Sequence, residues 1–234
     1  MTSTLDISLK FKAKFKVSAV MIDLDGTLVH TAPEIAAAAN LMLADLNLPV
    51  LPYRQVESYI GEGALVLIKR CLTGQKNVEP NSVLFEKAEA LFFAHYANNA
   101  ANSKPYAGVI DGLQALWNKG LRLACVTNKP EEFTLPLLKA SGLADFFELV
   151  VSGDTLHKKK PDPIQLHHIC AKFDVPEFEA MLVGDSATDI AAAQAAGCFI
   201  VTVPYGYNQG LPLDVSQVDA TINDLTELEA ILID

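Results

Sequence analysis

The sequence predicts an α/β fold, in which a Rossmann-like, mostly parallel sheet with helices on both faces is interrupted by an inserted helical domain. After residue 105, short apolar segments rich in branched side chains alternate with helical segments, as in repeated βαβ units. One similar apolar segment lies near the N-terminus, and the stretch between it and the repeats is helical in character. The chain has 234 residues, of which 50% are hydrophobic and 20% charged, so it is long enough to bury the core of such a fold.

The first strand is expected at residues 17–24 (VSAVMIDL), a short apolar run that leads into acidic residues and a glycine. Four helical stretches follow, supported by alanine-rich composition and by prolines suited to a first helical turn. They span residues 33–47, 52–60, 64–72 and 82–100. We therefore expect residues 32–101 to form the inserted helical domain, and residues 1–31 and 102–234 to form the α/β core.

The later strands and helices are expected to alternate along the rest of the chain. The predicted strands span residues 121–127, 149–152, 180–184 and 199–203. The predicted helices span residues 108–119, 131–140, 163–173 and 188–196. Glycines follow three of these helices, as helix ends favour. Trp117 and Phe133 lie at helical spacings that suit core positions.

The charge balance argues against two classes of partner. Eighteen basic and 28 acidic residues give a formal net charge of -10, which disfavours attraction to nucleic-acid phosphates and to anionic membrane surfaces. No apolar run approaches the roughly 18 residues that a membrane-spanning helix needs. We expect neither nucleic acid nor membrane as a partner. An anionic substrate would need positive charge concentrated at its site.

The N-terminal segment and the cysteines predict a cytoplasmic protein. Lysines at every second position interrupt the segment, so it lacks the apolar run of a secretory signal. They are Lys10, Lys12, Lys14 and Lys16. The cysteines are far apart and no pair has CxxC spacing, which favours reduced packing residues. They are Cys71, Cys125, Cys170 and Cys198.

Polar residues follow the predicted strands where each strand ends or in the loop beyond it. In open α/β sheets, ligands bind beyond the carboxyl ends of the strands, so these side chains are the candidate site. They are Asp23, Asp25 and Gly26 at the end of the first strand, Thr127 and Asn128 at the end of the second, Lys160 in the loop after the third, Asp185 at the end of the fourth, and Asp189 at the start of the next helix. Four carboxylates in one crevice would repel each other unless a hard cation holds them together, and oxygen ligands favour Mg²⁺ over zinc.

The pattern of these residues suits phosphoryl transfer. Asp23 and Asp25 are two residues apart, so one carboxylate can attack phosphorus while the other handles the proton of the leaving group. The Thr127 hydroxyl, the backbone N–H groups around Asn128 and Gly26, and Lys160 can bind the phosphoryl oxygens. Each signal alone has a plainer explanation, as a solvated turn, a helix cap or a solvated lysine run. Their joint placement at strand ends favours a catalytic site.

Four segments resemble the motifs of the haloacid dehalogenase superfamily of phosphotransferases. They are DLDGTLVHT (23–31), VTNKP (126–130), KKKPDP (158–163) and GDSATDI (184–190). The helical insert resembles the mobile cap of that superfamily. Three further segments are similar to the phosphoglycolate phosphatases within it: YAGVIDGLQAL (106–116), GDTLHKKKPDP (153–163) and AAGCFIVTVPYGYNQG (195–210). The likeness extends from about residue 17 to the C-terminus.

The resemblance implies a role for each matching residue. Asp23 is implied to be the nucleophile and a metal ligand, and Asp25 the general acid and then base, with its backbone carbonyl on the metal. Thr127 and Lys160 are implied to hold the phosphoryl group. Asp185 is implied to complete the metal site, with Asp189 as a further ligand or a support. The implied activity is magnesium-dependent hydrolysis of 2-phosphoglycolate, a small phosphate ester, to glycolate and phosphate through an aspartyl-phosphate.

Two positions depart from the family pattern. His30 replaces a frequently acidic residue, and Glu62 replaces a frequent amide in the cap loop. A glutamate near a substrate carboxylate would oppose binding unless Arg54, Lys69 or another cation compensates. His30 is expected to be a polar residue at the hinge, and Lys129 a lysine at a helix entry.

Alternative functions remain open at this point. A sugar phosphomutase, or a phosphatase for another small metabolite, would share every core residue, because specificity lies in the cap. A phospho-acceptor signalling module would need no general acid, so Asp25 and the insert argue against it. No GxGxxG follows the first strand, which argues against dinucleotide binding. The protein is expected to be a monomer or a homodimer.

Overall fold

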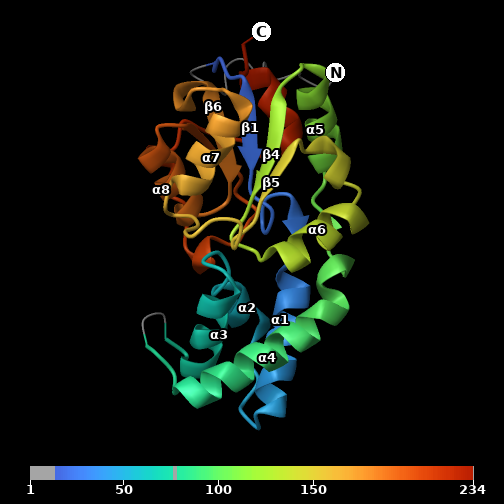
Figure 1. The fold of residues 1–234 in the computed structure, drawn as a ribbon, viewed down its shortest axis with the longest axis vertical. Coiled ribbons are helices and arrows are strands. Elements are labelled where there is room, and N and C mark those ends of the chain that lie inside the picture. Colours follow the sequence, from blue (N-terminus) through green and yellow to red (C-terminus); the bar gives the residue numbers. More distant parts are fainter. Residues whose placement is uncertain (1–13, 76–77, 234) are drawn as a thin grey trace, which may run out of the picture.

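A parallel sheet forms one end of the molecule, and its strands point toward a helical part at the other end (Figure 1). The structure is a computed structural model that describes residues 14–75 and 78–233. Within these residues, six strands pair in the order β5-β4-β1-β6-β7-β8, and every pairing is parallel. The strands are β1 (Ala19–Ile22), β4 (Arg122–Val126), β5 (Leu149–Val151), β6 (Ala180–Gly184), β7 (Phe199–Thr202) and β8 (Ala220–Thr221). The predicted α/β fold is confirmed, although β8 was not expected.

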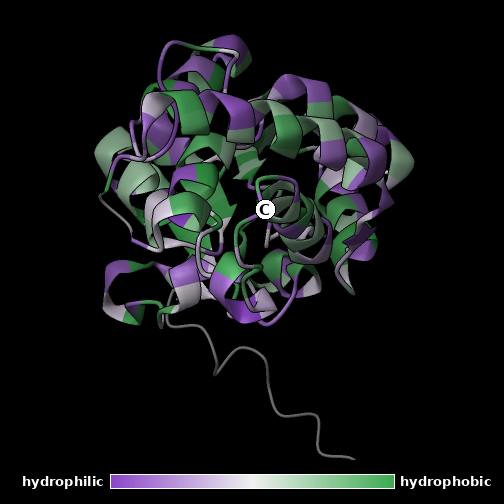
Figure 2. Ribbon diagram, turned by 90° about the horizontal axis from the view of Figure 1, so that it is seen from below, coloured by the Kyte–Doolittle hydropathy of each residue, from purple (hydrophilic) through white to green (hydrophobic). Residues whose placement is uncertain are grey.

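Helices cover both faces of the sheet, because successive side chains of a strand point to opposite faces. On β1, Val20 and Ile22 pack into the cluster that contains Leu113 of helix α5 (Val109–Asn118). Met21, between them, packs on the other face with α7 (Ile164–Phe173) and α8 (Ala187–Ala196). Helix α6 (Glu131–Ala140) follows β4. Figure 2 shows that the peripheral helices carry both hydrophilic and hydrophobic segments, as expected of helices that cover a core.

The helical part has an apolar core of its own. Its helices are α1 (Ala32–Asp45), α2 (Tyr53–Glu57), α3 (Ala64–Thr73) and α4 (Ser82–Asn99). Met42, Ile68 and Phe92 are fully or nearly fully buried in this core. Helix α4 starts after Asn81, whose side chain accepts a hydrogen bond from the backbone N–H of Leu84. These four helices match the predicted ones within a few residues.

The two chain crossings between the sheet and the helical part lie side by side. Strand β2 (Val29–His30) pairs antiparallel with β3 (Lys104–Pro105), so that His30 lies opposite Lys104. This ribbon could not be predicted from the sequence, since two residues are too few to show a period of alternation. The pairing joins the entry and the exit of the helical part into one hinge.

The structure also tests the expectations for the cysteines and for two aromatic residues. In the described part of the chain, no helix combines the length and the apolar character needed to cross a membrane. The four cysteines are buried and free of disulfides. The expectation for Trp117 is wrong, because its relative exposure is 59%, whereas Phe133 is buried as expected. Lys10 and Lys12, two of the lysines at every second position of the N-terminal segment, lie outside the described residues.

Candidate active site

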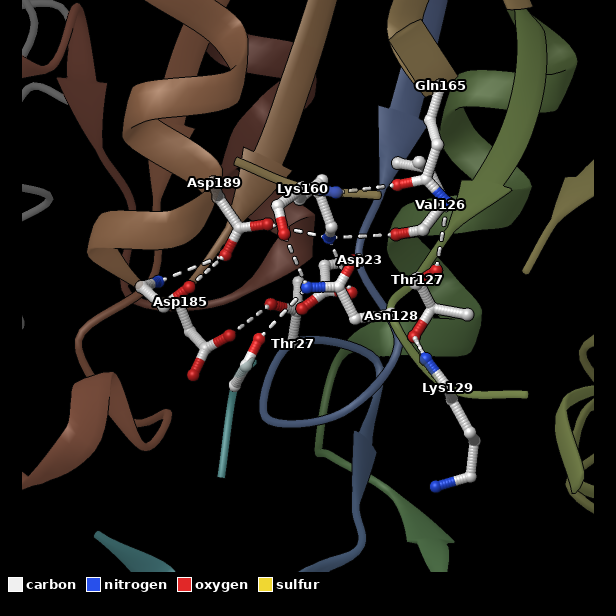
Figure 3. Close-up of polar contacts among 12 residues, drawn as sticks. Asp23, Thr27, Val126, Thr127, Asn128, Lys129, Lys160, Gln165, Asp185 and Asp189 are labelled. Atoms are coloured by element: carbon white, nitrogen blue, oxygen red, sulfur yellow. Dashed lines mark hydrogen bonds and ion pairs between the residues drawn. The ribbon is translucent and has the colours of Figure 1, made fainter. Parts of the chain in front are cut away.

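The candidate site lies at the carboxyl end of β1, the central strand that separates β4 from β6. Asp23 leaves β1 beside β6, and its backbone N–H donates to the carbonyl of Val183 (2.9 Å). Thr127 leaves β4 and donates in the same way to Val151 (2.9 Å). Because the strands are parallel and in register, their polar ends meet at one edge of the sheet (Figure 3).

Three carboxylates meet closely enough to share one metal ion. One oxygen from each of Asp23, Asp185 and Asp189 lies within 4.8 Å of the others. The three residues are 8%, 3% and 1% exposed, respectively. Buried acidic groups at this spacing repel one another unless a cation compensates, and an all-oxygen donor set suits a hard divalent ion. The residues therefore fit a divalent metal site.

The pKa shifts of these carboxylates also indicate a site for a cation. Burial raises the pKa of Asp23 well above its usual value; Lys160 opposes this shift, and Asp189 and Asp185 add to it. Burial and then the charge of Asp189 raise the pKa of Asp185 to about 7. A bound cation would favour the charged forms of these carboxylates.

Lys160 lies inside the carboxylate cluster. Its Nζ is 2.8 Å from Oδ1 of Asp23 and 2.7 Å from Oδ1 of Asp189. It also donates to the carbonyl of Val126 (2.9 Å), as Figure 3 shows. Burial alone would lower the pKa of Lys160, but Asp189 and Asp23 outweigh burial and raise it. The lysine is therefore a fixed positive charge next to Asp23.

Close packing of loops holds Asp185 in place. The backbone N–H of Tyr207 donates to Oδ2 of Asp185 (2.6 Å), and the Thr27 hydroxyl donates to Oδ1 (3.2 Å). A Cβ atom on Gly26, whose φ is +89°, would lie 2.5 Å from Oδ2 of Asp185. The N–H of Gly26 donates to the carbonyl of Val29 (3.0 Å), so this predicted phosphate donor has an internal partner. In this structure Gly26 serves the close approach of the two loops.

Asn128 and Asp189 connect the site to neighbouring loops and to the start of helix α8. The side-chain amide of Asn128 donates to the carbonyls of Lys160 (2.8 Å) and of Gly61 in the helical part (3.2 Å). Oδ2 of Asp189 accepts from the hydroxyl (2.6 Å) and the backbone N–H (3.2 Å) of Ser186, which forms a capping box at the start of α8. Asp189 is thus both a member of the carboxylate cluster and a helix cap.

Asp25 pairs with Lys129, a contact that was not predicted from the sequence. Nζ of Lys129 is 2.8 Å from Oδ1 of Asp25 and 4.8 Å from the ring centre of Tyr96. Burial alone would lower the pKa of Lys129, but the charge of Asp25 raises it above its usual value. Lys129 was expected to be a lysine at a helix entry. Its position directly after Thr127 and Asn128 was the available signal for a role in the site.

A pocket between the sheet and the helical part gives access to these groups. On the sheet side its lining includes Asp23, Asp25, Thr127, Lys129 and Lys160. On the helical side its lining includes Ile35, Ile60, Leu67, Phe92, Phe93 and Tyr96. One wall is therefore charged and the other is largely apolar, as in many small-molecule sites.

The two departures from the family pattern have defined partners. Glu62 forms an ion pair with the buried Arg70 and accepts a hydrogen bond from Gln209 (2.9 Å). The compensating cation is thus Arg70, while Lys69 pairs with Glu79. Nδ1 of His30 lies 3.0 Å from the hydroxyl of Tyr106 and 3.2 Å from that of Tyr207. His30 is therefore a polar residue at the hinge, as expected.

A parallel α/β sheet, an acidic cluster that fits a metal ion at its carboxyl edge and a helical insert over that edge together define a protein with a small-molecule site of the kind found in α/β enzymes. The chain belongs to the haloacid dehalogenase-like hydrolase family, whose model matches residues 20–203.

Similar proteins cover nearly the whole chain. The phosphoglycolate phosphatases of Thiobacillus denitrificans and Nitrosospira multiformis are each 50% identical over 212 residues, which is 90% of this chain and 93% of theirs. The crystal structure of a predicted phosphoglycolate phosphatase from Haemophilus somnus 129PT is 35% identical in sequence. It has a TM-score of 0.87 and covers 92% of this chain and 98% of that one.

Proposed function

We propose that this hydrolase is a magnesium-dependent phosphatase that converts 2-phosphoglycolate to glycolate and phosphate through an aspartyl-phosphate. The observation that carries the proposal is the buried carboxylate of Asp23, 2.8 Å from Lys160 and close to two further carboxylates. The names of the relatives that are 50% identical support the choice of substrate.

In the first step, a carboxylate oxygen of Asp23 attacks phosphorus, and the bond between phosphorus and the glycolate oxygen breaks. Asp25 gives a proton to that oxygen, so glycolate leaves as an alcohol. Asp23 then carries the phosphoryl group. Asp25 lines the same pocket as Asp23, and the hydrogen bond that Lys129 donates to its Oδ1 fixes the position of its carboxyl group.

In the second step, Asp25 takes a proton from water, and the water oxygen attacks phosphorus. The acyl-phosphate bond breaks, phosphate leaves and the Asp23 carboxylate is restored. One residue thus serves as acid and then as base.

The phosphoryl oxygens carry negative charge in both steps, and Lys160, the Thr127 hydroxyl and the backbone N–H groups around Asn128 bind them. Asp23, Asp185 and the backbone carbonyl of Asp25 would hold magnesium, with Asp189 as a further ligand or a support. When bound, magnesium supplies positive charge that offsets the carboxylates and the phosphoryl oxygens.

Residues 32–101 act in this proposal as a cap over a core of residues 1–31 and 102–234. The apolar cap wall excludes bulk water and limits the substrate to a small ester. We also propose a cytoplasmic location, in keeping with four buried cysteines that are free thiols.

The test is a comparison of kcat/KM across small phosphate esters, with magnesium and with excess chelator. We expect 2-phosphoglycolate to be the best substrate, activity to require the metal, and Asp23→Asn to abolish it. A preference for hexose phosphates would support the alternative of a sugar phosphomutase or sugar phosphatase. Absence of hydrolysis across the panel in the presence of magnesium would contradict the proposal.

A further inference from the structure

Two cations line the pocket among the described residues, and they differ in how fully their hydrogen-bond donors are used. The ammonium group of Lys160 has three partners, namely Asp23, Asp189 and the carbonyl of Val126. A lysine ammonium has three donors, so all the donors of Lys160 have partners in this structure, and a phosphoryl oxygen would replace one of them. Lys129 donates to one oxygen of Asp25 and otherwise faces the ring of Tyr96.

Tyr96 provides an independent observation in the same pocket. It belongs to helix α4 in the helical part, lines the pocket and is 3% exposed. Its hydroxyl is near the Lys129 ammonium group, which cannot accept a hydrogen bond, so the hydroxyl proton has no acceptor among the described residues. A buried hydroxyl without an acceptor is costly, and an acceptor on a bound ligand would remove that cost.

The surroundings of these two groups favour an anionic acceptor. The Tyr96 ring packs against Phe92 (5.6 Å between ring centres) and Phe133 (5.0 Å). Aromatic walls lower the local dielectric, so a charged contact there is stronger than in water. Asp25 connects these two groups to the site of phosphoryl transfer, because it is two residues from Asp23 in sequence and its carboxyl group contacts Lys129.

We propose that Lys129 and Tyr96 form the subsite for a second anionic group of the substrate, a carboxylate on the part that leaves. Lys129 donates to one carboxylate oxygen and the Tyr96 hydroxyl to the other. The substrate class is then a phosphate ester of a short hydroxy acid, and these two residues determine that specificity. This inference rests on the proposed phosphatase function.

Binding without turnover tests the subsite directly. The probes are 3-phosphonopropionate, a non-hydrolysable isostere of 2-phosphoglycolate, and propylphosphonate, which lacks the carboxylate. Calorimetry in the presence of magnesium should show that the wild-type protein prefers the carboxylated probe by about 10- to 100-fold, as expected of a charge-assisted hydrogen bond. Equal binding of the two probes would overturn the inference.

Three variants assign the preference to residues. Lys129→Met keeps the aliphatic chain and removes the charge, and should reduce the preference by at least about 10-fold. Tyr96→Phe removes one hydroxyl, keeps the ring, and should reduce the preference by a smaller factor even if Lys129→Met does not fold. Lys158→Met, at a lysine whose side chain is 59% exposed, is the matched control and should keep the wild-type preference. Wild-type preference in both pocket variants would overturn the inference.

Kinetics separate this inference from the proposed function. The ratio of kcat/KM for 2-phosphoglycolate to kcat/KM for 2-hydroxyethyl phosphate cancels any effect of Lys129 on the position of Asp25. A wild-type enzyme that hydrolyses 2-phosphoglycolate, with the same ratio in Lys129→Met, contradicts the subsite alone. A wild-type enzyme that binds 3-phosphonopropionate preferentially but does not hydrolyse 2-phosphoglycolate supports the subsite and contradicts the proposed function.

Discussion

The hydroxyl of Tyr207 lies 2.8 Å from the backbone nitrogen of Thr31 and accepts its hydrogen bond at the hinge. It also accepts from the N–H of Ala32 (2.9 Å), the first residue of α1. Helix α1 has no side-chain cap from its own N-terminus, so a residue from a distant loop performs this task. The same tyrosine donates its backbone N–H to Asp185. Tyr207 therefore connects the carboxylate cluster to the hinge of the helical part.

Tyr207→Phe should loosen this hinge. Loss of the shared acceptor leaves two N–H groups without a partner, and we expect a loss of about 1–2 kcal/mol in the free energy of unfolding. Hydrogen exchange should become faster at the Thr31 and Ala32 amides. Tyr53→Phe, at a tyrosine that is 40% exposed, is the control and should change neither quantity. Unchanged exchange at both hinge amides would show that Tyr207 is not the cap.

Gly26→Ala should displace a proposed metal ligand, whereas Gly120→Ala should not. Both glycines have a positive φ, +89° and +75°, so both variants carry a backbone penalty of about 1–2 kcal/mol. Only the Cβ atom at position 26 would lie 2.5 Å from Asp185; the site at position 120 has no atom within 4 Å. We expect weaker metal binding by calorimetry in Gly26→Ala alone. Equal metal affinity in the two variants would argue against the steric account.

The metal-free protein should lose stability as pH rises toward neutrality because of Asp185. Its pKa of about 7 in the folded protein exceeds the unfolded value of about 4, so the folded state binds more protons between these values. This contribution to stability is fully present when the pH is below the pKa of Asp185 in the unfolded state. It is lost as the pH rises through the pKa of Asp185 in the folded state. The raised pKa of Asp23 acts in the same direction.

The measurement is the unfolding free energy of chelator-treated protein against pH, compared with Asp185→Asn, which removes this titration. The wild-type protein should lose stability relative to the variant between about pH 5 and pH 7, by at most about 1.4 kcal/mol per pH unit. Because protons compete with the metal, metal affinity should rise over the same range. Parallel stability curves for the two proteins would contradict the shift at Asp185.

The sequence was sufficient to predict which strand ends would meet. Asp23, Thr127 and Asp185 each follow a short apolar segment, and parallel pairing of those segments brings the three residues to one edge of the sheet. Local composition and periodicity also located all eight α-helices of the described chain to within a few residues, because each helix has an apolar face or a clear start or stop signal.

Contacts between distant segments could not be predicted in this way. Lys129 and Asp25 are 104 positions apart, and no local pattern indicates that their side chains would pair. The hinge ribbon and β8 are two residues per strand, too short for periodicity. Trp117 has a spacing that suits a core, but its side of α5 faces solvent, and spacing alone does not reveal which side is covered.

Asp25→Asn should slow turnover without preventing attack by Asp23. We expect kcat to fall by about 10²–10⁴, the usual contribution of general acid–base catalysis. When the leaving group needs little acid assistance, the larger effect should fall on the second step, in which Asp25 acts as the base. Steady-state kinetics with 2-phosphoglycolate and with an aryl phosphate, which needs less acid assistance, will check this. A variant with wild-type kcat on 2-phosphoglycolate would exclude Asp25 as the acid.

The most direct test of the account asks whether phosphorus becomes bonded to Asp23. The Asp25→Asn enzyme is mixed with an aryl phosphate and magnesium, quenched in acid and reduced with borohydride, which converts an aspartyl-phosphate to homoserine. Peptide mass spectrometry should find homoserine at position 23, and none when Asp23 is replaced by Asn. Turnover with an unmodified Asp23, or homoserine at another aspartate, would contradict covalent catalysis at this residue.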